Sequence, residues 1–122
     1  MFKPSAKIIA DSINTNGDRL TTFVLTYHRF IHSEFMTHRM LSKNSSSSRA
    51  IPVEKMIKLV DSSQVDPIYW GANCKGMSAK EEMGDDAQYL AKSVWDTARQ
   101  NAIQSAKHLI QLGAHKQILN RL

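Results

Sequence analysis

The chain has 122 residues, of which 42% are hydrophobic and 22% are charged, and its formal net charge is +5. This length suits a single small domain over residues 1–122 and leaves little room for a second core. No apolar run of membrane-spanning length and no secretory signal occurs, so we expect a cytoplasmic protein that does not enter a membrane. The lone Cys74 excludes an internal disulfide and does not support a cysteine-based zinc site.

The positive charge is concentrated in two segments that are far apart in the sequence. Residues 28–58 carry six Lys or Arg against two Glu, and residues 107–122 carry three Lys or Arg and no acid. Residues 78–96, in contrast, carry five acids against two lysines. If the two basic segments meet in the fold, they form a site for an acidic ligand, and an ordinary solvated surface is the alternative.

The N-terminal region has the pattern of an antiparallel β-hairpin. Two β-prone runs, Ala6 to Ile13 and Leu20 to Tyr27, flank a polar segment that contains Asn16 and Gly17. Asn-Gly is a strong short-range hairpin signal because both residues tolerate positive φ.

A helix is predicted from Phe30 to Leu41, because apolar residues recur there near helical spacing. Glu34 and His38 are four residues apart and should share one face of that helix. The helix is expected to end near Ser42.

A loop is expected at residues 45–48, followed by a helix that begins at Pro52 and runs to about Val60. Residues 61–77 contain too many Gly, Pro, Asn and Asp residues for a regular element. Two residues of this second loop are candidates for burial, Tyr69 and Trp70.

The last long element is predicted to be a helix that ends at Gly113. Ser78 to Glu81 reads as a capping box at its start. Apolar residues then recur every three or four positions from Ala87 to Ile110, which is the pattern of an amphipathic helix. A hairpin followed by helices predicts an α+β fold, in which the N-terminal antiparallel sheet packs with helices that include this long one.

The segment from Thr37 to Arg49 combines basic side chains with small hydroxyl residues. His38, Arg39 and Arg49 surround a run of serines, and such a run lets a ligand approach the backbone amides. A Ser-rich flexible linker is the alternative, although a linker does not need basic residues at both ends. We interpret the segment as an anion-binding loop.

The spacing T-H-R-x2-S-x-N-x2-S-x-R resembles the signature R-H-R-x2-S-x-N-x2-S-x-R-Y of flavin-dependent thymidylate synthases. Thr37 replaces the first Arg of that signature and Ala50 replaces its closing Tyr. Six positions match, namely His38, Arg39, Ser42, Asn44, Ser47 and Arg49. The residues from Phe30 to Met36 and from Gly113 to Leu122 also look like that family, particularly its phage and bacterial branch.

The resemblance implies reductive methylation of dUMP to dTMP. Methylene-tetrahydrofolate is then the carbon donor, FAD the redox cofactor and NADPH the hydride source. The family's usual account needs no protein nucleophile and no metal, so the protein binds, orients and stabilises charge.

The resemblance also implies roles for single residues. Three positions are expected to bind the flavin cofactor: His38, Arg39 and Asn44. Five positions are expected to bind the nucleotide: Glu34, Ser47, Ser48, Arg49 and Arg121.

The resemblance implies a chain that continues beyond the point corresponding to Leu122 and active sites that lie between the subunits of a homotetramer. We therefore expect the 122 residues to be the N-terminal portion of such an enzyme, truncated at the C-terminus, with shared active sites and no nucleic-acid partner.

Two other classes of function remain as alternatives. A zinc-dependent hydrolase could use His28, His32 and His38 with Glu34, although their spacing is not that of H-E-x-x-H. A nucleic-acid-binding module without catalysis could use the basic loop, with three aromatic residues as stacking groups: Phe35, Tyr69 and Trp70.

Overall fold

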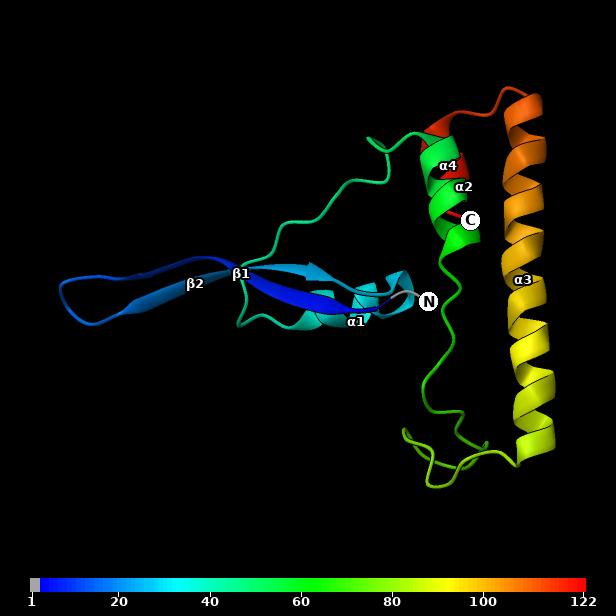
Figure 1. The fold of residues 1–122 in the computed structure, drawn as a ribbon, viewed down its shortest axis with the longest axis horizontal. Helices are drawn as coiled ribbons and strands as arrows, with labels where there is room; N and C mark the ends of the chain where they lie inside the picture. Colours follow the sequence, from blue (N-terminus) through cyan, green and yellow to red (C-terminus); the bar gives the residue numbers. More distant parts are fainter. Residues whose placement is uncertain (1–2) are drawn as a thin grey trace. The chain divides into compact units, whose positions relative to one another are not determined.

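The computed structural model describes residues 3–122, and the chain divides into two compact units (Figure 1). Unit 1 is Met1–Asn44 and unit 2 is Ser45–Leu122. Unit 1 contains two strands and a short helical segment, and unit 2 contains three helices. This content confirms the predicted α+β class, whereas the expectation of one domain over residues 1–122 stays a prediction.

Unit 1 begins with the predicted antiparallel hairpin. Strand β1 (Ser5–Ile13) pairs with strand β2 (Arg19–Thr26), with Ile8 opposite Phe23 and Ala10 opposite Thr22. Residue 9 is therefore the extra residue of a β-bulge in β1.

The hairpin turn is organised by a side chain that was not singled out from the sequence. The Asn14 Oδ1 atom accepts hydrogen bonds from the backbone N–H groups of Asn16 and Asp18, both at 2.9 Å. Gly17 has φ of 89°, while no residue other than glycine has positive φ in the described part of the chain. The Asn-Gly pair therefore located the turn correctly, but only its glycine uses the left-handed region.

The two faces of the hairpin remain open to solvent. Every residue of β1 is exposed, and in β2 only Thr21 is half-buried. Its apolar side chains include Ile8, which is 51% exposed, and Phe23, which is 52% exposed. A two-stranded hairpin on its own is only marginally stable in water. The many exposed apolar side chains are therefore unusual for a hairpin with both faces exposed.

The helix predicted from Phe30 to Leu41 is much shorter than expected. A 3-10 turn, η1 (Arg29–Ile31), leads into helix α1 (His32–Thr37), and His38 already has extended backbone angles. The prediction that the helix ends near Ser42 was wrong, because α1 stops at Thr37. The Thr37 hydroxyl and the Lys43 amine donate to the carbonyl oxygens of Glu34 and Met36, which are among the last four of the helix and have no partner within it.

Unit 2 contains helices α2 (Val53–Ser62), α3 (Asp85–Gln111) and α4 (Lys116–Leu119). Helix α2 begins at Val53, one residue later than predicted, with Pro52 at its N-cap, and it ends two residues beyond the predicted Val60. Helix α3 ends as predicted, before Gly113, which has φ of 78°.

The predicted capping box at Ser78 to Glu81 was wrong. Helix α3 begins at Asp85, with Gly84 at its N-cap. The Glu81 carbonyl instead accepts from the Ala72 amide at 2.8 Å, so this stretch pairs with the chain near Gly71 rather than forming a helical turn.

The buried apolar side chains of the described residues all lie in unit 2. They are Val53, Ile103, Ala106 and Leu119. Figure 1 shows α3 alongside α2, and the buried residues of α3 lie in its C-terminal half. In its N-terminal half, Leu90 is 63% exposed and Val94 is 70% exposed, so only part of the predicted apolar stripe is covered.

The two aromatic residues predicted to be buried behave differently. Tyr69 is 51% exposed, so its predicted burial was wrong. Trp70 is half-buried, and its ring meets Trp95 of α3 edge-on with 6.0 Å between the ring centroids. The Trp95 Nε1 atom donates a hydrogen bond to the Val65 carbonyl at 2.8 Å, which ties the loop after α2 to α3.

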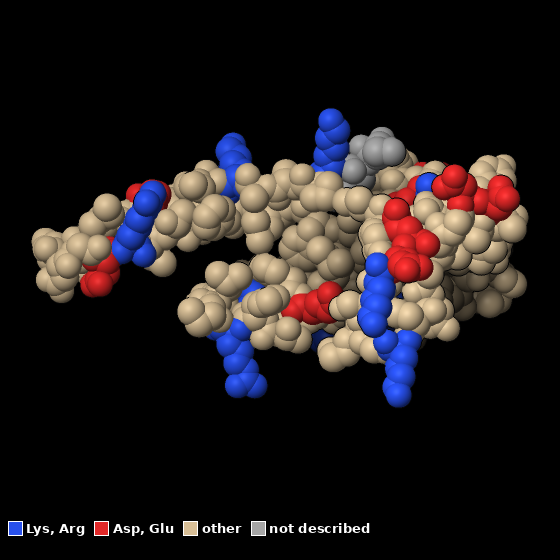
Figure 2. Space-filling view, turned by 90° about the horizontal axis from the view of Figure 1, so that it is seen from below, with Lys and Arg blue, Asp and Glu red and all other residues tan. Residues whose placement is uncertain are grey.

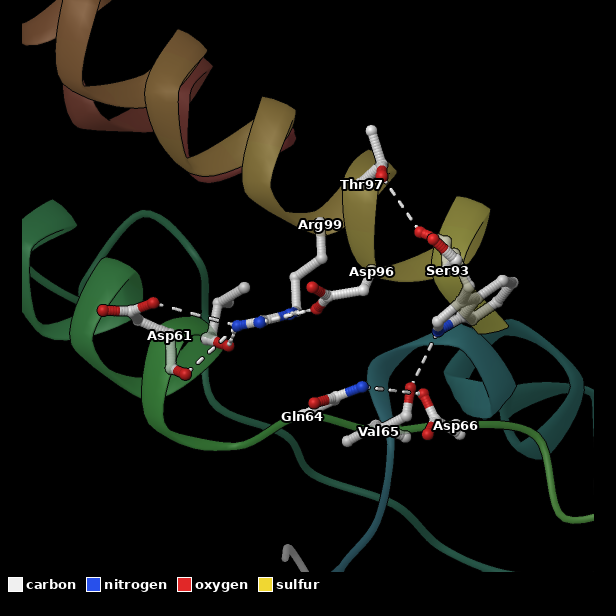
Figure 3. Close-up of polar contacts among 10 residues, drawn as sticks. Asp61, Gln64, Val65, Asp66, Ser93, Asp96, Thr97 and Arg99 are labelled. Atoms are coloured by element: carbon white, nitrogen blue, oxygen red, sulfur yellow. Dashed lines mark hydrogen bonds and ion pairs between the residues drawn. The ribbon is translucent and has the colours of Figure 1, made fainter. Parts of the chain in front are cut away.

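Arg99 of α3 joins this helix to the end of α2 (Figure 3). Its Nη1 atom donates to the carbonyl oxygens of Val60 and Asp61, at 3.0 and 3.1 Å. Its Nε atom donates to Asp96 at 2.8 Å, so the guanidinium group is held in position by a carboxylate one turn away. Arg99 thereby satisfies carbonyl groups in the last turn of α2 that have no partner within the helix.

Among the helices of the described residues, none is long and apolar enough to cross a membrane.

Candidate functional site

The first half of the candidate loop begins at the end of α1 in unit 1. The Thr37 hydroxyl donates to the Glu34 carbonyl at 2.7 Å, and His38 follows with φ of −72° and ψ of 101°. Because the helix stops before His38, the prediction that Glu34 and His38 share a helix face was wrong. The side chains of His38 and Arg39 are exposed.

Lys43 closes the end of α1, and the sequence reasoning assigned it no role. Its amine donates to the carbonyl oxygens of Phe35, at 3.3 Å, and Met36, at 3.2 Å, and also to that of His38. The same amine lies 5.5 Å from the centre of the Phe35 ring. A cation at a helix C-terminus is favourable, because the last carbonyl groups carry a partial negative charge. Lys43 therefore fixes the backbone that presents His38 and Arg39.

The second half of the loop is a tight turn in unit 2. The Ala50 N–H donates to the Ser47 carbonyl at 3.0 Å, and the Arg49 N–H donates to the Ser47 hydroxyl at 3.3 Å. Short hydroxyl side chains favour such turns because they can pair with nearby backbone groups. The Arg49 side chain projects from this turn and is exposed.

Asn120 fastens this turn to the C-terminal segment. Its Nδ2 atom donates to the carbonyl oxygens of Ser48, at 2.6 Å, and Ile51, at 2.8 Å. Asn120 is only 4% exposed, and its Oδ1 atom has no hydrogen-bond partner among residues 3–122. Arg121 is the next residue and is exposed. Two segments that are about 70 residues apart in sequence thus meet at one buried amide.

The predicted site residues fall into two groups. The three positions expected at the cofactor lie in unit 1, together with Glu34. The remaining positions expected at the nucleotide lie in unit 2. There Asn120, the residue before Arg121, donates a hydrogen bond to the carbonyl of Ser48 and so joins the two segments. Residues 45–58, the part of the first basic segment that lies in unit 2, therefore meet the C-terminal basic segment through Ser48 and Asn120.

No sequence signal identified Asn120 or Lys43 as structural partners. Asn120 lies within the C-terminal stretch that resembles the synthase family, but its side chain could be placed only once the fold was known. Lys43 occupies a variable position of the signature. Both side chains donate hydrogen bonds to backbone carbonyl groups. Every residue has such a carbonyl, so the sequence does not indicate which one is bound.

The two alternative functions, a zinc-dependent hydrolase and a nucleic-acid-binding module, each require certain side chains to lie together or to be accessible. Among the described residues, no three His, Cys, Asp or Glu side chains gather closely enough to hold a metal ion. The His32 Nδ1 atom instead lies 2.7 Å from the Tyr27 hydroxyl.

The proposed nucleic-acid-stacking residues have other contacts. The Phe35 ring lies 5.1 Å from that of Tyr27, and Trp70 contacts Trp95. Figure 2 shows that several Lys and Arg side chains on the face in view lie beside Asp or Glu side chains.

The chemistry available to the two groups is that of anion binding. In unit 2 the guanidinium group of Arg49 and the hydroxyl group of Ser47 are both exposed on one turn, and such groups can bind a phosphate or carboxylate. In unit 1 an imidazole, a guanidinium and an amide are exposed, and all three can donate hydrogen bonds to a phosphate-bearing cofactor. Comparisons with family models, curated proteins and solved structures found no match to this chain.

Proposed function

We propose that this chain is part of a flavin-dependent thymidylate synthase, which converts dUMP to dTMP with methylene-tetrahydrofolate, FAD and NADPH. The proposal depends on the signature from His38 to Arg49. The structural observation that supports it best is the pair of hydrogen bonds from Asn120, because these fasten the end of the signature to the segment that contains Arg121.

On the nucleotide side, Arg49 and Arg121 supply two exposed guanidinium groups for the phosphate of dUMP. Ser47 and Ser48 supply hydroxyl groups and backbone amides. The Ser47 hydroxyl accepts from the Arg49 amide, so its own proton can still be donated to a phosphate oxygen. A binding role therefore suits Ser47, which has no hydrogen-bonded His to activate it as a nucleophile among the described residues.

On the cofactor side, the donor groups of His38, Arg39 and Asn44 fit a phosphate-bearing cofactor. FAD supplies the redox chemistry when it is bound. Glu34 is proposed to reach the pyrimidine. Thr37 replaces the first Arg of the signature, and its hydroxyl donates a hydrogen bond to the Glu34 carbonyl. Because threonine carries no positive charge, we propose a weakened contact with FAD at this position.

The proposal includes a homotetramer with shared active sites and a location in the cytoplasm. Assembly is supported by the apolar side chains that remain exposed on the hairpin, such as Leu20 at 71% and Phe23 at 52%. Exposed apolar patches of this kind commonly mark sites of protein association.

The test is an absorption titration of the purified protein with FAD, followed by dUMP. We expect a flavin spectrum that dUMP perturbs. Arg49→Ala and Arg121→Ala should each weaken dUMP binding by about 1.5–3 kcal/mol, or roughly 10- to 150-fold, because each removes a charge-assisted phosphate contact.

Arg29→Ala is the matched control, since Arg29 is exposed and has no proposed role. It should leave the affinity for dUMP unchanged. A folded protein that binds no FAD at micromolar concentration would contradict the proposed function. Equal affinities for dUMP in the wild type and both site variants would remove Arg49 and Arg121 from the nucleotide site.

A further inference from the structure

A pocket of about 350 Å³ lies beside α2, within unit 2. Its volume is at the lower end of the range for small-molecule sites, roughly 300–1,000 Å³, so it suits a small organic molecule rather than a peptide. Residues from α2 form most of its wall, and Ser46 and Ile51 complete it from the preceding loop. The Ile51 carbonyl is held by Asn120, so this part of the wall is anchored.

The apolar part of the wall consists of Ile51, Met56 and Leu59. Ile51 and Met56 are half-buried, whereas Leu59 is 52% exposed. These side chains present a surface for an apolar body. Met56 adds a flexible, polarizable thioether, which packs well against aromatic rings.

The charged part of the wall consists of Lys55 and Lys58, which are three residues apart on α2. Within residues 3–122 neither lysine forms an ion pair. Residues at this spacing are neighbours on a helix surface, so the two like charges repel each other. An anion between them would remove that repulsion and gain two attractive interactions.

We propose that this pocket binds a small amphiphilic anion, with an aromatic body on Ile51, Met56 and Leu59 and a carboxylate or phosphate held by Lys55 and Lys58. The site is separate from the proposed nucleotide site, because neither Arg49 nor Arg121 lines it. Its apolar wall also fits a hydrocarbon ring better than a polar pyrimidine. The proposal does not depend on the proposed function.

The test uses protein labelled with carbon-13 at the methionine methyl groups and follows their NMR signals. Met56 is the reporter, and Met56→Leu assigns its signal. The chain has six methionines, and two of them, Met40 and Met77, are 97% and 105% exposed, so they report non-specific adsorption. The probes are 1-naphthyl phosphate, 2-naphthoate and the uncharged 2-naphthalenemethanol.

We expect a saturable shift of the Met56 signal with at least one anionic probe and an affinity for the uncharged probe that is about tenfold weaker. The two anions distinguish a phosphate ligand from a carboxylate ligand. The double variant Lys55→Gln with Lys58→Gln should weaken anion binding about tenfold. Glutamine favours helix nearly as well as lysine, so α2 should be retained, which circular dichroism would verify.

The matched control is Lys92→Gln with Lys107→Gln on α3, which makes the same change in net charge away from the pocket. It should leave the anion affinity within about twofold of the wild type. The proposal is overturned if no probe shifts Met56 saturably, if the uncharged probe binds as well as the anions, or if both double variants weaken binding equally. Displacement of the bound probe by dUMP would also overturn it, because the pocket would then belong to the nucleotide site.

Discussion

The side-chain contacts within unit 1 differ from those within unit 2. In unit 1 the side-chain contacts join neighbours along the chain or across the hairpin, such as Tyr27 with His32 and Asp11 with Arg19. Unit 2 also has three side chains, Trp95, Arg99 and Asn120, that hydrogen-bond to residues about 30 to 70 positions away. All the buried apolar residues of the described chain also lie in unit 2.

The two parts of the candidate site are supported by different contacts. The turn that carries Arg49 is attached to a buried residue of its own unit. His38 and Arg39, in contrast, follow a six-residue helix. Among the described residues that come after this helix, Lys43 is the one whose side chain hydrogen-bonds to its last carbonyl groups. We therefore expect the part of the candidate site in unit 2, proposed to bind the nucleotide, to be more rigid in the free protein than the part in unit 1.

The strongest test of this comparison is the substitution Ile103→Ala. Ile103 is 3% exposed on α3, so truncation leaves a cavity and should lower the free energy of unfolding of unit 2 by about 2–4 kcal/mol. Both tryptophans lie in unit 2, at positions 70 and 95, so tryptophan fluorescence during urea unfolding follows this unit.

Leu90→Ala on the same helix is the control. Leu90 is 63% exposed, and its truncation should change the free energy of unfolding by no more than about 0.5 kcal/mol. Equal losses in the two variants would mean that the buried half of α3 does not form the core of unit 2.

A smaller effect is expected from Asn120→Ala. This change removes both hydrogen bonds to Ser48 and Ile51, and it should cost about 1–3 kcal/mol because two carbonyl groups lose their buried donor. Hydrogen exchange at the amides of residues 47–51 should also become faster than in the wild type.

Asn101→Ala offers a matched comparison, because Asn101 is exposed on α3. It should leave both the unfolding curve and the exchange of residues 47–51 close to those of the wild type. If Asn120→Ala behaves in the same way, the C-terminal segment does not hold the turn of Arg49.

The elements that could be predicted from the sequence are those with a local signal. The hairpin was found because two β-prone runs flank an Asn-Gly pair, and the end of α3 was found because Gly113 follows a long periodic stretch. In the candidate site, the signature identified Arg49 and the resemblance of the C-terminal stretch identified Arg121, and the roles of both residues stay predictions.

The remaining features depend on side chains that bind distant backbone carbonyl groups. Arg99 reaches Val60 across 39 positions, and Asn120 reaches Ser48 across 72 positions, without any periodic pattern. The capping box at Ser78 failed for a related reason: the Ala72 amide pairs with the Glu81 carbonyl, and this tertiary contact outweighs the local helix signal.

The smallest predicted effect concerns the pH dependence of unit 1. The Arg19 guanidinium, and then the Thr21 hydroxyl, hydrogen-bond to Asp11 and hold the pKa of that carboxyl below its usual range. Because the pKa is lower in the folded hairpin than in the unfolded chain, the pair stabilises the hairpin above the unfolded pKa. That contribution is lost as the pH falls through the folded pKa.

NMR titration of the Asp11 carboxyl carbon measures this pKa directly, and cross-strand contacts between β1 and β2 report the hairpin. Arg19→Gln should raise the Asp11 titration midpoint toward the ordinary aspartate range, because the largest cause of the shift is gone. Asp11→Asn should make the cross-strand contacts less dependent on pH between neutral and strongly acidic solution. The effect is small, since both partners are at the surface, where solvent screens their attraction. An Asp11 midpoint that is the same with and without Arg19 would show that the pair does not form, and the hairpin would then lose one of the local contacts that distinguish unit 1 from unit 2.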